Sequence, residues 1–149
     1  MISPAPHNNT TLVLRRTFTA SRQRVFRAWI TPRALEHWLR PRGMSVTVSQ
    51  LEARVGGSFR FEVEDGGSIV GTYLHIVPPE QLVFTWSSGA TPGRETVVTL
   101  DFLDQGPVTE VVLTHEGLST EAMRAWVGAG WPFLLDALAS VLSSPHLDF

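Results

Sequence analysis

The chain has 149 residues and no cysteine, which excludes disulfides, thiolate metal sites and a cysteine nucleophile. This length is typical of one domain that buries its own core. All 12 basic residues are arginines and eight of them lie between Arg15 and Arg42, although the formal net charge is only -2. A basic segment can attract nucleic acid or an anionic ligand. Because no nucleic-acid-binding motif accompanies these arginines, we interpret them as a basic helical layer beside an acidic sheet.

The sequence also bears on location. No apolar run approaches the about 20 residues that a membrane-spanning helix needs. The first ten residues, MISPAPHNNT, lack the basic and apolar regions of a signal peptide. We therefore expect a cytoplasmic protein with no membrane span. Residues 1–10 are predicted to be a flexible N-terminus, and residues 11–149 a single domain.

The first predicted elements are a strand and two short helices. In "TLVLRRTFTA", the alternation of Leu12 and Leu14 predicts a strand. Ser21 is a suitable N-cap for a helix over the following residues. Thr31-Pro32 predicts the start of a second helix, since threonine caps helices and proline suits their first position.

From Met44 onward the apolar spacing changes to two, which is typical of strands. Asp65-Gly66-Gly67 predicts a tight hairpin, and Pro78-Pro79-Glu80 predicts a turn. Asp104-Gln105-Gly106-Pro107 joins two further strands. Six antiparallel strands are therefore expected after the short helices.

A long apolar helix is predicted at the C-terminus, where "GAGWPFLLDALASVL" (residues 128–142) repeats at helical spacing. This pattern is interrupted by Gly128, Gly130 and Pro132. The proline removes one helical hydrogen bond and clashes with the carbonyl of Gly128, four residues back, and Gly130 further loosens the turn. Two alternatives follow. Either one helix is kinked there, or a short helix ends and a new one begins at Trp131-Pro132. Both alternatives predict a break in the helix near Trp131-Pro132.

Several segments together resemble a known family. The resemblance extends from Arg16 to Leu142 and is carried by "FTASRQRVFRAWITPRALEHWLRP", "EARVGGSFRF", "GTYLHIVPPEQLVFTW", "VTLDF", "TEVVLTHEGL" and the GW…L…L pattern of the last helix. In order and spacing they are similar to the activator-of-Hsp90-ATPase-like (AHSA1-like) family of the START-like, or SRPBCC, helix-grip superfamily. The resemblance implies an α+β helix-grip fold. In this fold a curved antiparallel sheet of six to seven strands wraps around a long C-terminal helix, two short helices follow strand 1, and a cavity separates helix and sheet.

The candidate site residues are aromatic, histidine and apolar side chains on the face of the sheet and the face of the C-terminal helix that are expected to meet. Strand alternation places His115 on the same face as Val111 and Leu113, and Tyr73 on the same face as His75. Buried Trp, Tyr and His need hydrogen-bond partners, so this composition favours a ligand pocket over a dry core. The predicted lining is Phe61, Tyr73, His75, Trp86, His115, Met123, Trp126, Trp131, Leu135 and Leu138.

Three functions are compatible with these residues. The leading hypothesis is binding of a small hydrophobic, aromatic or lipid-like molecule in the cavity. A second is a polyketide cyclase- or hydrolase-like enzyme with His75 or His115 as acid–base. A third, implied by the resemblance, is an Hsp90-cochaperone-type interaction module.

No metal and no cofactor are expected. Cysteine is absent, and the histidines are scattered at positions 7, 37, 75, 115 and 146, without the spacing of a metal-binding motif. Nucleic acid is not an expected partner either, given the slightly negative net charge. The expected partner is a small hydrophobic ligand. The oligomeric state stays open, with a homodimer as one alternative.

Overall fold

The computed structural model describes residues 11–144, so the predictions for residues 1–10 and 145–149 lie outside the described part. Seven strands form one sheet in the order β1-β7-β6-β5-β4-β3-β2, and every neighbouring pair is antiparallel. The strands are β1 (Thr11–Phe18), β2 (Val46–Leu51), β3 (Ser58–Val63), β4 (Ser68–Val77), β5 (Gln81–Trp86), β6 (Thr96–Asp104) and β7 (Thr109–Glu116). The helices are α1 (Arg22–Ala28), α2 (Pro32–Trp38), the short 3₁₀ turn η2 (Pro41–Gly43) and α3 (Glu121–Ser143).

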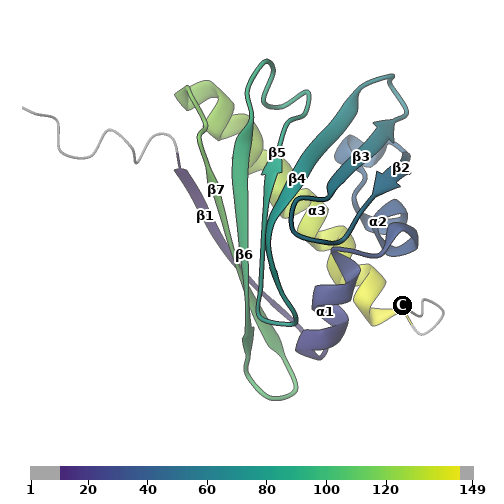
Figure 1. The fold of residues 1–149 in the computed structure, drawn as a ribbon. Coiled ribbons are helices and arrows are strands. Elements are labelled where there is room, and N and C mark those ends of the chain that lie inside the picture. The colour runs from purple at the N-terminus through teal and green to yellow at the C-terminus, as the bar shows by residue number, and fades with distance from the viewer. Residues whose placement is uncertain (1–10, 145–149) are drawn as a thin grey trace, which may run out of the picture.

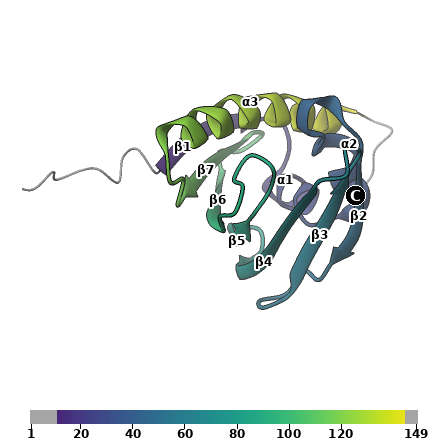
Figure 2. The same cartoon turned by 90° about the horizontal axis from the view of Figure 1, so that it is seen from above.

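The arrangement confirms the predicted helix-grip fold. Strands β2 to β7 follow one another as a meander, and β1 adds to the free edge of β7 (Figure 1). Seen from above, the sheet is curved and α3 lies across its concave side (Figure 2). The short helices α1 and α2 connect β1 to β2 and contact α3 near its C-terminal half. The core therefore lies between α3 and the sheet.

Local capping explains where the helices begin. The Ser21 hydroxyl accepts a hydrogen bond from the backbone N–H of Arg24, as the sequence predicts for the start of α1. The Thr120 hydroxyl accepts one from Met123 N–H at the start of α3. At α2, Thr31 is the N-cap residue, but its hydroxyl donates to the Arg27 carbonyl instead.

A β-bulge interrupts β4 and changes which face its side chains take. Tyr73 pairs with Phe84, whereas His75 pairs with Val83, so one residue is left over between them. Tyr73 consequently points into the core, and His75 is exposed on the outer face of the sheet. The prediction that Tyr73 and His75 share a face is therefore wrong, because simple alternation does not allow for the extra residue.

Helix α3 is continuous from Glu121 to Ser143 and contains Pro132 in its interior. The alternative of two separate helices is thus wrong. The buried side chains of the helix lie in its part from Val127 to Leu142: Val127, Trp131, Leu134, Leu135, Leu138, Val141 and Leu142. Among the described helices, α3 alone has a length and composition that could suit a membrane span, but core helices of soluble proteins meet the same criterion.

Candidate functional site

A groove of about 620 Å³ runs along the N-terminal half of α3. It lies between the helix, the β3–β4 hairpin, the β5–β6 loop and η2. The residues that line it are Pro41, Arg42, Met44, Val63, Asp65, Gly67, Ser68, Ile69, Trp86, Ser88, Gly89, Ala90, Trp126, Val127, Ala129, Gly130, Trp131, Phe133 and Leu134.

Large side chains of α3 form one wall of the groove, and small residues of the same helix leave room for it. Trp126 and Phe133 are large apolar side chains that remain 61% and 51% exposed, an unusual use of aromatic surface. Between them on the helix stand Ala129 and Gly130, and a Cβ added to Gly130 would have no neighbour within 4 Å. The groove is therefore wide because the exposed helix residues between Trp126 and Phe133 are small. A break in the helix is not needed to explain this width.

The hairpin end of the groove carries a polar rim. Arg42 and Asp65 both line the groove, and Arg42 Nη2 lies 3.9 Å from a carboxylate oxygen of Asp65. Arg42 has a φ of 52°, in the left-handed region that non-glycine residues rarely adopt. Both side chains are largely exposed, so this ion pair contributes little to stability.

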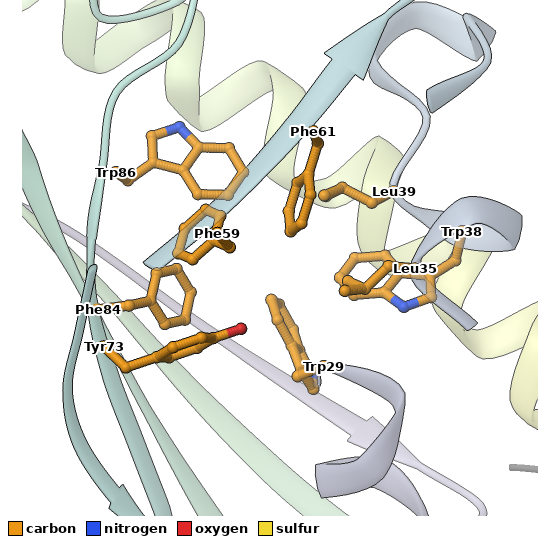
Figure 3. A pocket seen from close by; sticks show the side chains of 9 residues that line it. All are labelled: Trp29, Leu35, Trp38, Leu39, Phe59, Phe61, Tyr73, Phe84 and Trp86. Atoms are coloured by element: carbon orange, nitrogen blue, oxygen red, sulfur yellow. The ribbon is translucent and has the colours of Figure 1, made fainter. Parts of the chain in front are cut away.

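A second, much smaller cavity lies deeper in the core (Figure 3). Its volume is about 10 Å³, room for one water molecule at most. The aromatic and leucine side chains that enclose it come from the sheet, from α2 and from the residues just after α1 and α2: Trp29, Leu35, Trp38, Leu39, Phe59, Phe61, Tyr73, Phe84 and Trp86.

The Tyr73 hydroxyl points into this inner cavity (Figure 3). Tyr73 is 2% exposed, and none of the side-chain hydrogen bonds found between residues 11 and 144 involves its hydroxyl. Burial raises the pKa of the Tyr73 phenol, since the charged form would lose its hydration. The side chain is therefore neutral and has an unused hydrogen-bonding group.

Trp86 separates the two spaces, because its side chain lines both the groove and the inner cavity. Its indole nitrogen points away from the cavity and donates a hydrogen bond of 3.2 Å to the Ser88 hydroxyl (Figure 3). On its other side the ring packs against Trp131, with ring centroids 5.2 Å apart. Trp86 is thus a wall one side chain thick.

His115 lies behind these aromatic rings and is fully buried. Trp131 Nε1 donates a hydrogen bond to His115 Nδ1 at 3.0 Å. Since an indole nitrogen can only donate, Nδ1 is the acceptor and the proton of the neutral ring is on Nε2. That Nε2 lies 2.7 Å from the Thr96 hydroxyl, which in turn donates to the Trp86 carbonyl.

Burial lowers the pKa of His115 to about 4. The Trp131 hydrogen bond acts in the same direction, because a protonated Nδ1 would face another donor. With both ring nitrogens engaged and the ring neutral near pH 7, His115 has neither a free lone pair nor access to solvent. The arrangement is that of a structural histidine that joins β7 to β6 and α3.

The remaining predicted residues fall into distinct places. Trp86, Trp126 and Trp131 line the groove, and Phe61, Tyr73 and Trp86 line the inner cavity. Leu135 and Leu138 are buried in the core and line neither space, and Met123 is half-buried outside both. His75 is on the outer face of the sheet.

Several lining residues escaped the sequence analysis. The hairpin and loop residues of the groove, Phe133, and the cavity residues Trp29 and Trp38 were not among the candidates. The helical spacing of Trp126 and Phe133, seven residues apart, is the signal that could have paired them. Within residues 11–144, no three His, Asp or Glu side chains come together as a metal site would need.

Comparison with known proteins assigns the chain to a family. Residues 19–143 match the family described as Activator of Hsp90 ATPase homolog 1-like protein. The chain belongs to this family. No protein of curated function gives a significant match.

Solved structures agree with this assignment. CV1439 from Chromobacterium violaceum is 28% identical, with a TM-score of 0.78 over 91% of this chain and 98% of that one. CalU16 from Micromonospora echinospora is 26% identical, with a TM-score of 0.69 over 89% of this chain and 76% of that one. DynU16, whose structure is described as that of a protein in the dynemicin biosynthetic locus, shares the fold at 21% identity. Its TM-score is 0.77 over 91% of this chain and 48% of that one.

Proposed function

We propose that this member of the Activator of Hsp90 ATPase homolog 1-like family binds a small hydrophobic molecule, aromatic or lipid-like, in the groove beside α3. The observation that carries the proposal is the groove itself, about 620 Å³ in volume and bordered by the exposed Trp126 and Phe133. Ligand sites typically measure about 300–1,000 Å³ and combine apolar walls with a few polar groups. A monomer gains nothing from exposing two large aromatic rings along one helix unless something covers them.

The lining indicates which ligands fit. Most of its side chains are apolar, and the charged pair Arg42–Asp65 stands at one end only. An elongated or ring-shaped apolar body would bury the aromatic surface, with its more polar end at the hairpin. The cytoplasm is the proposed location. A homodimer stays a prediction that gel filtration or light scattering can test.

The two other hypotheses have less support in the described residues. An acid–base enzyme needs an accessible titratable group beside the ligand. His115 has both nitrogens occupied, and His75 lies on the opposite face of the sheet from the groove. Activation of Hsp90 rests on the family's name alone, and fold membership does not supply a partner.

The test is binding of the neutral apolar dye N-phenyl-1-naphthylamine, whose emission rises when it leaves water. We expect saturable enhancement with the wild-type protein. Ala129→Trp fills the groove from an exposed helix position and should weaken dye binding at least tenfold. Ala125→Trp is the matched control, because Ala125 is an exposed alanine of the same helix that does not line the groove. Absence of dye binding to the wild type, or equal binding by the two variants, would contradict the proposal.

A further inference from the structure

We propose that residues 1–10 fold back over the outer face of α3 and cover Trp126 and Phe133, in competition with any ligand of the groove. The outer face is the exposed surface of the N-terminal half of α3 and consists of Ala125, Trp126, Ala129, Gly130 and Phe133. The docking itself is independent of the proposed function, whereas the competition rests on it.

The outer face of α3 is an apolar surface that no described element covers. No Asp, Glu, Lys or Arg occurs between residues 125 and 135. The sheet packs against the opposite side of this half of the helix, and nothing else in the described part of the chain lies over the outer side (Figure 2). Trp126 and Phe133 are consequently 61% and 51% exposed, which marks the surface as a docking site.

Residues 1–10 join the fold directly beside this surface. Arg124 Nε donates a hydrogen bond of 2.9 Å to the Thr11 carbonyl, which holds the start of β1 against α3. A Cβ placed on Gly128 would lie 3.5 Å from Leu12 Cδ1, so β1 and the helix are in contact here. The segment therefore leaves the fold at the helix turn that carries Trp126.

Ten residues are long enough to cover both aromatic rings. A helix is about 10–12 Å across with its side chains, and the seven residues from Trp126 to Phe133 advance roughly 10 Å. An extended segment of ten residues spans about 33 Å. At roughly 100° per residue, Ala125 and Ala129 lie between the side of the helix that contacts β1 and the side that carries the rings. Their short side chains allow a crossing segment to approach the helix closely.

The composition of the segment matches the surface. Five of its first six residues, MISPAP, are apolar, and residues 1–10 contain no Asp, Glu, Lys or Arg. Contact with the uncharged outer face therefore removes no charged side chain from water. Pro4 and Pro6 favour an extended polyproline conformation, which typically docks on exposed aromatic rings. Asn8-Asn9 are residue types common in turns, as a reversal from β1 back over the helix requires.

A second copy of the chain is the alternative occupant of the outer face, but the exposed area favours the chain's own segment. At 61% and 51% exposure, Trp126 and Phe133 together present roughly 250 Å². Pairing of two copies through these rings would bury about 500 Å², well below the about 1,200 Å² of a stable interface. A tethered segment needs less area, because its effective concentration at the surface is high.

Paramagnetic NMR tests the docking without any ligand. Because the chain has no cysteine, Ser3→Cys gives a single attachment site for a nitroxide label. In ¹⁵N-labelled protein we expect the nitroxide to broaden the indole N–H signal of Trp126, which Trp126→Phe identifies, and to leave that of the fully buried Trp38 sharp. Leu103→Cys carries the control label, since Leu103 is exposed at the far end of β6, and this label should leave the Trp126 signal sharp.

The competition is tested with N-phenyl-1-naphthylamine. Ile2→Asp places a charge in the apolar part of the segment and should release it from the outer face. If the segment is docked in roughly 70–90% of the molecules, the apparent Kd of the dye should tighten about threefold to tenfold. Asn9→Asp is the matched control, because it adds the same charge to the polar part, and its dye affinity should equal that of the wild type.

The outcomes separate this inference from the proposed function. An unbroadened Trp126 signal would overturn the docking. Broadening of equal size in ¹⁵N protein without a label, caused by added spin-labelled protein, would also overturn it, because the segment would then bind a second copy. Equal dye affinities of Ile2→Asp and Asn9→Asp would overturn the competition and leave ligand binding in the groove intact. Failure of the dye to bind any of these proteins would overturn the proposed function and the competition, while the NMR result alone decides the docking.

Discussion

Trp131 on α3 and His115 on β7 are joined by a hydrogen bond from the indole nitrogen to His115 Nδ1, at 3.0 Å and out of contact with water. The bond continues through Thr96 to the carbonyl of Trp86, so one chain of polar groups crosses from the helix to three strands. Every polar atom in it has a partner, and a network of this kind fixes how the helix sits on the sheet. Of these residues, Trp86 and Trp131 also line the groove.

Trp131→Phe tests this link. Phenylalanine keeps an aromatic ring but cannot donate, so His115 Nδ1 would be left buried without a partner. We expect the free energy of unfolding to fall by about 1–3 kcal/mol, in addition to the loss of packing from a smaller ring. Urea unfolding followed by circular dichroism measures it. Trp126→Phe is the control, because Trp126 is 61% exposed and should change stability by no more than about 0.5 kcal/mol. A loss as small in Trp131→Phe as in the control would contradict the structural role.

Gly130→Ala addresses the helix itself. Gly130 lies inside α3 with nothing within 4 Å of the position of a Cβ, and alanine is the better helix former. We expect the substitution to raise the free energy of unfolding by up to about 1 kcal/mol. In Gly71→Ala, by contrast, the new Cβ would lie 2.0 Å from the Thr85 carbonyl oxygen, and stability should fall sharply. Destabilisation by Gly130→Ala would indicate that the helix is not regular there.

In β7, where the register is regular, the strand pattern predicted correctly which side chains are buried. His115 lies on the covered face with Val111 and Leu113, as alternation predicts. In β4 the same reasoning placed His75 wrongly, because a bulge is a property of the pairing with β5 and leaves no mark in single-strand periodicity.

The candidate site was harder to predict than the fold. Apolar periodicity identified α3 and its buried stripe, but it interpreted Gly128, Gly130 and Pro132 as a break, whereas the helix continues through them. The groove depends on residues that are small or far apart in sequence, such as Ala129 and the β3–β4 hairpin. The neutral state of His115 depends on Thr96 and Trp131, whose proximity appears only once β6, β7 and α3 are packed.

Tyr73→Phe should not destabilise the protein. None of the side-chain hydrogen bonds between residues 11 and 144 involves the Tyr73 hydroxyl, so its removal breaks no bond within that part of the chain. We expect the free energy of unfolding to stay constant or rise by about 1 kcal/mol. Thr96→Val is a suitable contrast, since it removes a buried hydroxyl with two partners and should cost about 1–3 kcal/mol. A clear loss of stability in Tyr73→Phe would show that the hydroxyl has a partner after all.

His115 should make the protein less stable as the pH falls below neutrality. Its pKa is about 4 in the folded protein, against about 6.5 for an unperturbed histidine in the unfolded chain. Between these values the unfolded state binds a proton that the native state does not, so the free energy of unfolding rises with pH. The free energy of unfolding that comes from a neutral His115 is fully present above about pH 6.5. It falls by on the order of 3 kcal/mol as the pH decreases to 4.

Urea midpoints measured from pH 7 to pH 4 give this slope, and histidine NMR gives the pKa directly. In His115→Gln the part of the slope that His115 causes should vanish, whatever the overall loss of stability. Titration of His115 near 6.5 would mean that its ring reaches solvent. The hydrogen bond from Trp131 would then not hold helix and sheet together, and an acid–base role for His115 would have to be considered again.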